Sequence, residues 1–322
     1  MGTSNASSPR HFLDIKDHST ETLRHILSLA ARVKALQQGR RHPLCPGLPL
    51  AGRALGLMMS RPSTRTRVSF EVGMKQLGGT VNVLTPSEMQ LGRGESIADT
   101  ARVLSRFLDV ITLRTGTDAN LRELARWSSV PVINGLTPIS HPVQILADIL
   151  TFEEHRGPIT GRKLAWIGDG NNVATSLIEA AARLGFTLHL ATPKGEFIPS
   201  EVAVDWARGN GGDIHLTHDP REAAEGADAI ITDTWVSMGD KDAEKRLKIF
   251  RPYHVDEAIM ALAAPDALFM HCLPAHIGEE VSEAVFESPA SVVFDEAENR
   301  LHAQKGLLLW CLEKDDLSAY QS

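Results

Sequence analysis

The chain has little cysteine and no excess of positive charge, and each shortage excludes a class of protein. Only three of its 322 residues are cysteine (Cys45, Cys272 and Cys311), so it lacks the paired cysteines of a disulfide-stapled secreted domain. Lysine and arginine total 33 against 40 aspartate and glutamate, a formal net charge of -7. Such a chain is a poor partner for a nucleic-acid backbone or an anionic membrane. If it binds a small anion, it must gather its cations locally.

Long apolar runs are also missing, so the sequence predicts no membrane span. The longest segment without Asp, Glu, Lys or Arg, residues 127–147, is interrupted by Pro131, Pro138 and Pro142 and carries many polar groups. Residues 1–9 are small and polar, and they lack the charged-then-apolar order of a secretory signal. We therefore expect a cytoplasmic protein with neither a nucleic-acid nor a membrane partner.

What the sequence does have is an alternation of short apolar runs with amphipathic stretches, over a length that suits two domains. This alternation is typical of a parallel sheet covered by helices. We predict an α/β fold of two such domains, the second Rossmann-like. The predicted strands are 54–59, 80–84, 110–114, 130–134, 164–167, 187–191, 214–217, 229–233, 268–271 and 292–294. The predicted helices include 23–36, 64–77, 97–107, 118–127, 141–155 and 297–313.

The pattern restarts after Gly157-Pro158, so we place the domain boundary near residue 150. Residues 1–150 then form the first domain and residues 151–322 the second, with the last helix packing back on the first domain. In open α/β sheets, ligands bind at the carboxyl ends of the strands. Polar motifs at those ends are therefore the candidates for a site.

A run of phosphate-type donors, Ser63-Thr64-Arg65-Thr66-Arg67, follows a predicted strand and opens a predicted helix. The unpaired N–H groups of a helix's first turn attract anions, and arginine offers a planar fork that matches phosphate oxygens. A lone serine, threonine and arginine at such a place is more often an ordinary capped helix start. Five consecutive donors at a strand-to-helix junction favour a phosphate site.

Further groups follow later strands of the same half. Arg114 ends a predicted strand, and His141 and Gln144 share one face at the start of a predicted helix. A phosphate that carries a carbonyl and an amide needs cations, donors for the carbonyl oxygen and an acceptor for the NH2 group. That set is supplied by Arg65, Arg67, Arg114, His141 and Gln144. Alone, His141 is more often a structural, hydrogen-bonded histidine.

Two motifs of the second half also follow strands. Asp233 begins a glycine-containing loop, where an acid suits the capture of an ammonium group, although an isolated acid there is more often a surface turn residue. The other motif is His271-Cys272-Leu273-Pro274, and a buried cysteine is usually an inert small hydrophobe. His271, Cys272 and His276 lack the spacing of a metal site, so we predict no metal.

Together these motifs resemble the aspartate and ornithine carbamoyltransferase family. The run S-T-R-T-R-V-S-F-E-V-G from Ser63 resembles the family's carbamoyl phosphate signature, and residues 89–96 and 141–148 extend the likeness over nearly the whole chain. D-x-x-x-S-M-G from Asp233 resembles the ornithine-recognising loop, and H-C-L-P resembles the matching catalytic loop. The resemblance implies transfer of the carbamoyl group of carbamoyl phosphate to the side-chain amine of L-ornithine. The products are L-citrulline and phosphate, as in arginine metabolism, and no cofactor is needed.

The resemblance also implies the site residues and the assembly. Gln90 would complete the pocket of a neighbouring subunit in a homotrimer with its active sites at subunit interfaces. The implied catalytic residues are Arg114, His141, Cys272 and Arg300. The implied carbamoyl phosphate ligands are Ser63, Thr64, Arg65, Thr66, Arg67, Gln90, Arg114, His141, Gln144, Cys272, Leu273 and Arg300. The implied ornithine ligands are Asn172, Asp233, Ser237 and Met238.

One segment departs from the family pattern. The chain reads Met58-Met59-Ser60-Arg61 where relatives usually carry I-F-E-K or a similar run. Arg61 keeps a cation there, whereas Ser60 removes an acidic residue. The departure puts the fine positioning near the phosphate loop in question.

Other functions remain open on the residues alone. A nicotinamide-dependent dehydrogenase is suggested by Gly168-Asp169-Gly170 after a strand, but Val173 stands where the fingerprint needs glycine or alanine. A non-catalytic regulatory module would show broken motifs, and none is broken. Within the family, an aspartate acceptor would call for extra cations rather than Asp233. Acetylornithine and putrescine are closer rivals, against which the loop Ser237-Met238-Gly239 argues.

Overall fold

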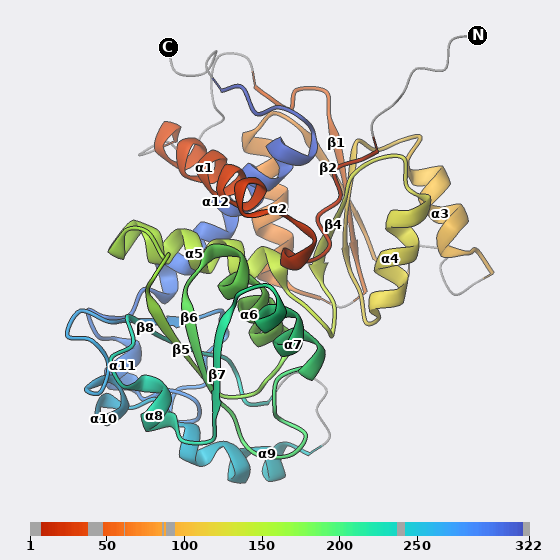
Figure 1. Ribbon diagram of the computed structural model, residues 1–322. Coiled ribbons are helices and arrows are strands. Elements are labelled where there is room, and N and C mark those ends of the chain that lie inside the picture. Colours follow the sequence, from red (N-terminus) through yellow and green to blue (C-terminus); the bar gives the residue numbers. More distant parts are fainter. Residues whose placement is uncertain are drawn as a thin grey trace. The chain divides into compact units, whose positions relative to one another are not determined.

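The computed structural model of the chain describes residues 8–37, 48–60, 62–85, 87, 94–236 and 242–317 (Figure 1). The chain divides into two units, each built around one parallel sheet. The first unit combines Met1–Pro138 with Arg300–Ser322, and the second is Ile139–Asn299. The predicted α/β class with two parallel sheets is confirmed.

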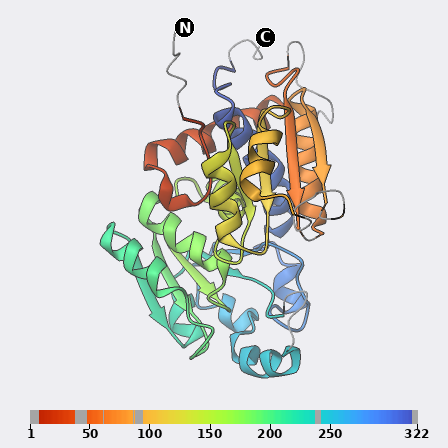
Figure 2. The ribbon, with the colours of Figure 1, turned by 90° about the vertical axis from the view of Figure 1, so that its right-hand side faces the viewer.

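The first unit has a sheet with the strand order β2-β1-β3-β4. Its strands are β1 (Ala54–Met59), β2 (Thr80–Leu84), β3 (Val110–Arg114) and β4 (Val132–Leu136). Helices α3 (Ile97–Leu104) and α4 (Asp118–Trp127) lie on one side of it (Figures 1 and 2). Met58, Ile111 and Leu121 meet there in one buried core. The central strands are apolar because both of their faces are covered.

The other helices of this unit come from opposite ends of the chain. They are η1 (Ile15–Asp17), α1 (Thr20–Leu36), α2 (Thr64–Gln76) and the end of α12 (Val293–Cys311). A Cβ on Gly306 of α12 would lie 2.6 Å from the backbone nitrogen of Ala30 on α1, and one on Gly73 of α2 would lie 3.4 Å from the Leu301 side chain. Gly306 therefore allows α12 to pack closely against α1, whereas a side chain at Gly73 would make only an ordinary contact with α12.

The second unit has the strand order β7-β6-β5-β8-β9. In chain order the strands lie third, second, first, fourth and fifth, which is the Rossmann arrangement. Its strands are β5 (Lys163–Ile167), β6 (Thr187–Ala191), β7 (Asp213–Thr217), β8 (Ala229–Thr232) and β9 (Leu268–His271). Its helices are α5 (Pro142–Arg156), α6 (Asn172–Leu184), α7 (Glu201–Gly209), α8 (Pro220–Ala224), α9 (Ala243–Phe250), η2 (Arg251–Tyr253), α10 (Glu257–Met260) and α11 (Glu283–Phe286).

Helices flank this second sheet as well. Figure 1 shows α6 and α7 on one side of the sheet and α8, α10 and α11 on the other. The apolar core under the latter group includes Ile167, Ile230 and Phe269 from the strands and Ile259 and Val285 from the helices. Among the described residues, no helix is long and apolar enough to cross a membrane.

The predicted strand at 292–294 is wrong. Val293 and Phe294 open helix α12. The chain pairs with Phe269 just before them, through an isolated bridge at Ser291 and a hydrogen bond from Val292 N to Phe269 O. Three apolar residues are too few to separate a short strand from the first turn of a helix. The last helix therefore begins at Val293 rather than at residue 297.

The predicted domain boundary near residue 150 stays a prediction. The division into units falls between Pro138 and Ile139, which assigns α5 to the second unit. Residues 300–322 belong to the first unit.

Burial of His302 on α12 predicts a loss of stability in mild acid. Burial, followed by the charges of Lys305 and Lys34, lowers the pKa of His302 from 6.5 to about 3. Between pH 6.5 and about pH 3, His302 binds a proton in the unfolded chain but not in the folded chain. The unfolding free energy is therefore highest above about pH 6.5 and falls as the pH is lowered through this range. From pH 7 to pH 5 the wild type should lose about 2 kcal/mol of unfolding free energy through this group.

Urea unfolding of the wild type and His302→Gln at the two pH values measures this loss. The glutamine variant cannot titrate in this range, so its stability should depend less on pH. An equal pH dependence in both proteins would assign the acid sensitivity to other groups.

Candidate active site

In the first unit, one threonine hydroxyl at the start of α2 collects three donors. Ser63 is the N-cap residue of α2, but its hydroxyl donates to Thr66 Oγ1 (3.2 Å) instead of capping the helix. Arg114 Nη1 donates to the same oxygen at 3.2 Å and Arg300 Nη2 at 3.0 Å. Thr66 is fully buried, and Arg300 is only 4% exposed. The hydroxyl thereby holds two guanidinium groups beside the first turn of a helix, where unpaired N–H groups already favour an anion.

The sheet topology explains why these residues meet. In this sheet β1 lies between β2 and β3, so the connections leave β1 and β3 in opposite directions. Helix α2 follows β1, and Arg114 ends β3, which pairs with β1 in parallel. Such a switch point, at the carboxyl ends of neighbouring strands, is where α/β sheets bind ligands. The sequence therefore predicted the correct edge of the sheet for Arg114.

The two remaining arginines of the predicted run differ in their surroundings. The Arg67 guanidinium is exposed and bonds Glu71 Oε1 at 2.8 Å, one turn further along α2. Arg65 is half-buried; its backbone oxygen accepts from Ser69 Oγ, but within the described part of the chain its guanidinium makes no hydrogen bond or ion pair. Thr64 is exposed at the first position of the helix. The structure thus groups Ser63, Thr66, Arg114 and Arg300, and it engages Arg67 elsewhere.

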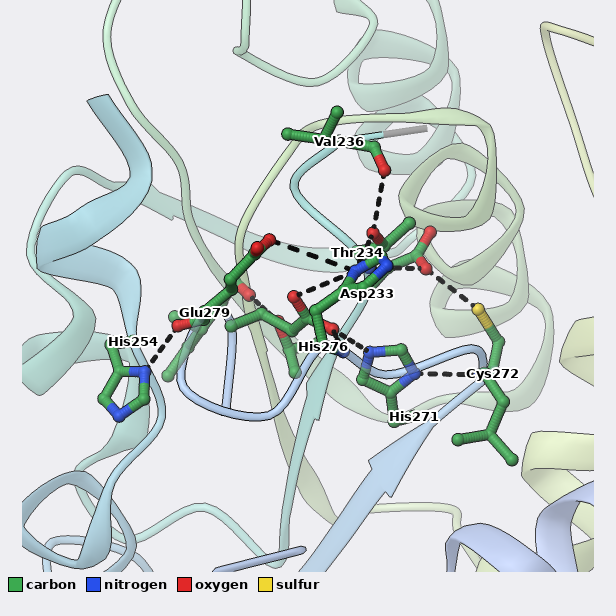
Figure 3. Close-up of polar contacts among 12 residues, drawn as sticks. Asp233, Thr234, Val236, His254, His271, Cys272, His276 and Glu279 are labelled. Atoms are coloured by element: carbon green, nitrogen blue, oxygen red, sulfur yellow. Dashed lines mark hydrogen bonds and ion pairs between the residues drawn. The ribbon is translucent and has the colours of Figure 1, made fainter. Parts of the chain in front are cut away.

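In the second unit, the predicted acid Asp233 contacts the predicted cysteine. Cys272 Sγ donates to Asp233 Oδ1 at 3.1 Å, and Asn171 Nδ2 donates to Asp233 Oδ2 at 2.8 Å. Figure 3 shows Asp233 and Cys272 facing each other across the ends of two strands. Asp233 follows β8, Cys272 follows β9 and Asn171 follows β5, so the group lies at the switch point between β5 and β8. Asp233 is 9% exposed, so this carboxylate lies in a largely desolvated place.

The thiol of Cys272 lies among acids. Burial and the carboxylates of Asp233, Glu296 and Asp148 raise the pKa of the Cys272 thiol well above its usual range. Gln144 Nε2 bonds Asp148 Oδ1 (2.7 Å) and Glu296 Oε1 (3.1 Å). This amide therefore joins the two acids. Cys272 is a neutral thiol that donates a hydrogen bond, not a thiolate nucleophile.

His141 and Leu273 are two further predicted residues that the structure describes in this unit. His141 is 4% exposed, immediately precedes α5, and its backbone N–H donates to Ser176 Oγ at 2.9 Å. Leu273 has a φ of 57°, a left-handed conformation that a leucine rarely adopts and that is costly outside a constrained site. Its backbone N–H donates to His271 Nδ1 at 2.8 Å.

Several predicted positions fall outside the described residues. Gln90, Ser237 and Met238 are among them, as is Arg61 of the departing segment. The described part of that segment places Met58 and Met59 in the buried strand β1 and leaves Ser60 exposed.

The structure also identifies groups that the sequence did not single out as ligands. Asn171 Nδ2 bonds Asp233, while Asn171 Oδ1 accepts from Val173 N and Ala174 N. The predicted Asn172 is the next residue, the first of α6. Asp148 and Glu296 are two such groups, and their carboxylates raise the pKa of the Cys272 thiol. The sequence could have identified Asp148, because it ends the motif of residues 141–148. No local sequence pattern marks Glu296.

Among the described residues, two groups of side chains have ligand atoms close enough together to hold one metal ion. Asp233, His271 and Cys272 form one, and His276, Glu279 and Glu280 form the other, each with ligand atoms within 4.8 Å of one another. In the first group, His271 Nδ1 already accepts from Leu273 N, and Nε2 lies 3.2 Å from Glu280 Oε1. A metal there would have to break one of these contacts.

The dehydrogenase alternative fits poorly at the glycine-containing turn after β5. A Cβ on Gly170 would lie 2.3 Å from the backbone nitrogen of Pro199, and Gly170 N donates to Phe197 O at 2.8 Å. The backbone at Phe197 and Pro199 thus occupies the space beside Gly170 that a dinucleotide pyrophosphate would need.

Comparison with known proteins gives the family. The model of the aspartate/ornithine carbamoyltransferase carbamoyl-P binding domain matches residues 10–154, and that of the Asp/Orn binding domain matches residues 160–311. The chain belongs to the aspartate/ornithine carbamoyltransferase family. The family resemblance and the carbamoyltransferase class predicted from the sequence are therefore confirmed.

Individual relatives agree with the family match. An ornithine carbamoyltransferase of Nitrobacter winogradskyi is 58% identical over 307 residues, covering 95% of this chain and 98% of the relative. The structure of ornithine carbamoyltransferase from Pyrococcus furiosus is similar with a TM-score of 0.88 and 48% identity, covering 94% of this chain and 96% of that one. The anabolic ornithine carbamoyltransferase of Campylobacter jejuni has a TM-score of 0.85 and 38% identity, covering 94% and 98%.

Proposed function

We propose that this enzyme transfers the carbamoyl group of carbamoyl phosphate to the side-chain amine of L-ornithine and releases L-citrulline and phosphate. The observation that carries the proposal is the location of the motif residues. Arginines converge on Thr66 at the switch point of one sheet, and Asp233 contacts Cys272 at the switch point of the other. Cations suit a phosphate, and an acid suits an ammonium group. The relatives named ornithine carbamoyltransferase support the choice of acceptor.

Carbamoyl phosphate is bound mainly from the first unit in this proposal. The first-turn N–H groups of α2, the hydroxyls of Ser63, Thr64 and Thr66, and the guanidinium of Arg65 bind the phosphate. Arg114 and Arg300, oriented by Thr66, donate to the carbamoyl oxygen, on which negative charge develops when the amine attacks. His141, Gln144 and the backbone of Leu273 bind the rest of the carbamoyl group. Gln90 adds a ligand from a neighbouring subunit.

L-Ornithine is bound from the second unit. Asp233 and Ser237 bind its α-ammonium group, and Asn172 with the backbone of Met238 binds its carboxylate. At neutral pH only about one in a thousand side-chain amines is unprotonated, since the amine titrates near 10.4 like a lysine. Cys272 already holds its proton because its pKa is raised, so it does not act as the base at neutral pH. The proton of the attacking amine goes instead to an oxygen of the departing phosphate.

The proposal includes the setting of the reaction. The enzyme is a cytoplasmic homotrimer of arginine biosynthesis, with residues 1–150 as the carbamoyl phosphate domain and 151–322 as the ornithine domain. The family models, which end and begin at residues 154 and 160, support this division. Light scattering of the purified protein tests the trimer.

Citrulline formation from carbamoyl phosphate tests the reaction, with ornithine, acetylornithine, putrescine and aspartate compared as acceptors. We expect a strong preference for ornithine. Turnover with another amine would retain the phosphate site but overturn the interpretation of the loop from Asp233 to Gly239. Absence of turnover with all four acceptors would contradict the proposed reaction.

A further inference from the structure

One buried carboxylate, Glu280, connects the two loops that carry Asp233 and Cys272. Glu280 and His271 are both completely buried. Glu280 Oε1 lies 3.2 Å from His271 Nε2 and accepts from the backbone N–H of His276 at 2.6 Å. A buried carboxylate is costly unless donors satisfy it. Both donors bind Oε1 and hold it at a defined place, whereas the buried Oε2 has no hydrogen-bond partner among the described residues.

The first branch of the network runs from Glu280 to Leu273. Because Leu273 N–H donates to His271 Nδ1, this nitrogen carries no proton. The imidazole is therefore neutral, with its hydrogen on Nε2 pointing at Glu280. The branch ends at the residue whose φ of 57° is unusual for leucine and which directly follows Cys272. Glu280 thus fixes the imidazole that holds the backbone of the Cys272–Leu273 turn.

The second branch runs from Glu280 to Thr234, next to Asp233. Thr234 Oγ1 donates to Val236 O at 3.1 Å and lies 3.0 Å from His276 Nδ1. Since the Thr234 hydroxyl has one hydrogen, His276 Nδ1–H is the donor in the second contact. Figure 3 shows Thr234 and His276 linking the loop of Asp233 to the loop of His271 and Cys272. Both ends of the Asp233–Cys272 hydrogen bond are therefore tied to the same carboxylate.

We propose that Glu280 is a positioning residue for ornithine carbamoylation, which acts through His271 and His276 to hold Cys272, Leu273 and Asp233 in their reactive arrangement. This inference rests on the proposed function for its kinetic consequences, but its structural consequence, the place of the Cys272 thiol, is independent of turnover. A buried acid with a purely structural role would affect folding stability alone. A positioning residue affects the ornithine step, because small displacements of groups at a reacting centre cost up to about a hundredfold in rate.

The test compares Glu280→Ala with Glu280→Gln and with Glu279→Ala. Glutamine keeps an acceptor oxygen for His271 and His276, so it should restore most of the function that alanine removes. Glu279 is the matched control, since its carboxylate is 38% exposed and 4.0 Å from His276 Nδ1. His271→Asn interrupts the network at a second point, the contact with Glu280. Asparagine can still accept from Leu273 N–H but is too short to reach Glu280.

Three quantities are measured for each folded variant: kcat/KM for ornithine, the inhibition constant of inorganic phosphate, and the rate of Cys272 alkylation by iodoacetamide mapped by mass spectrometry. We expect Glu280→Ala and His271→Asn to lower kcat/KM for ornithine by about ten- to a hundredfold and to alkylate Cys272 faster. Phosphate inhibition should stay unchanged in all variants, because the phosphate ligands lie in the first unit. Glu279→Ala should behave as wild type.

Wild-type values of kcat/KM and alkylation in Glu280→Ala would overturn the proposal. An equal loss in Glu280→Ala and Glu280→Gln that follows only their thermal midpoints would also overturn it, in favour of a structural role. If Glu280→Ala does not fold, the same three measurements on Glu280→Gln and His271→Asn test the role of Glu280. A wild type that forms no citrulline contradicts the proposed function, and alkylation of Cys272 then still decides the role of Glu280.

Discussion

Arg65→Ala is expected to lower kcat/KM for carbamoyl phosphate by about a hundred- to a thousandfold, whereas Arg67→Ala changes it by less than about threefold. Both arginines belong to the same run and lie on the first turns of α2. Arg67 is exposed and bonds Glu71, so its charge is screened by solvent and partly offset by that carboxylate. Arg65 has no such partner among the described residues.

The physical reason for the large effect is that Arg65 supplies both charge and a forked donor to an anion at a helix N-terminus. Binding of inorganic phosphate, measured by calorimetry, should weaken with Arg65→Ala and stay unchanged with Arg67→Ala. Arg65→Lys separates the two contributions, since lysine keeps the charge but loses the fork, and it should recover only part of the activity. Equal effects of the Arg65 and Arg67 substitutions would contradict the assignment of Arg65 to the phosphate.

The sequence predicted the carboxyl edge of the first sheet well. Hydrophobic periodicity located the strands, and the parallel topology brings their carboxyl ends together. The strands at residues 54–59, 80–84 and 110–114 have the predicted bounds. The first and third are buried apolar runs between clear turn signals, whereas the edge strand 80–84 alternates polar and apolar residues. Once two such strands are neighbours, residues after their carboxyl ends come together. Thr66 and Arg114 are an example, at 3.2 Å.

Contacts across long stretches of sequence could not be predicted in the same way. Glu296 bonds Gln144 and the backbone N–H of His271, from a helix more than a hundred residues after Gln144. Nothing local to Glu296 signals a buried acid, because glutamate is ordinarily exposed on helices. The contact of Asn171 with Asp233 was not predicted either, because it joins two loops that are 62 residues apart in the sequence.

Asp233→Asn is expected to raise the KM for ornithine at least about tenfold and to lower kcat as well. The substitution removes the negative charge that pairs with the α-ammonium group, and an unpaired charge in a desolvated site costs several-fold to a thousandfold in binding. Asparagine also cannot keep every contact. Its oxygen can serve Cys272 and Thr234 N, but its NH2 group would face the NH2 of Asn171. The Asn171 amide cannot flip to relieve the contact between the two NH2 groups, because its oxygen accepts hydrogen bonds from the first turn of α6.

The same variant should change the chemistry of Cys272 in a defined direction. The Asp233 carboxylate, acting after burial, raises the pKa of the Cys272 thiol, so its replacement by an amide should lower that pKa. Alkylation of Cys272 followed from pH 7 to pH 10 should therefore begin at lower pH in Asp233→Asn than in the wild type.

Asp213→Asn is the matched control for both measurements. Asp213 begins β7, whereas Asp233 follows the end of β8 in the same parallel sheet, so the two carboxylates lie at opposite edges of that sheet. Asp213→Asn should leave both the ornithine KM and the alkylation profile unchanged. If Asp233→Asn shifts the alkylation profile but leaves the ornithine KM unaltered, Asp233 acts on the thiol alone and does not bind the ammonium group. If neither quantity moves, the contact between Asp233 and Cys272 has no part in recognition of the amine.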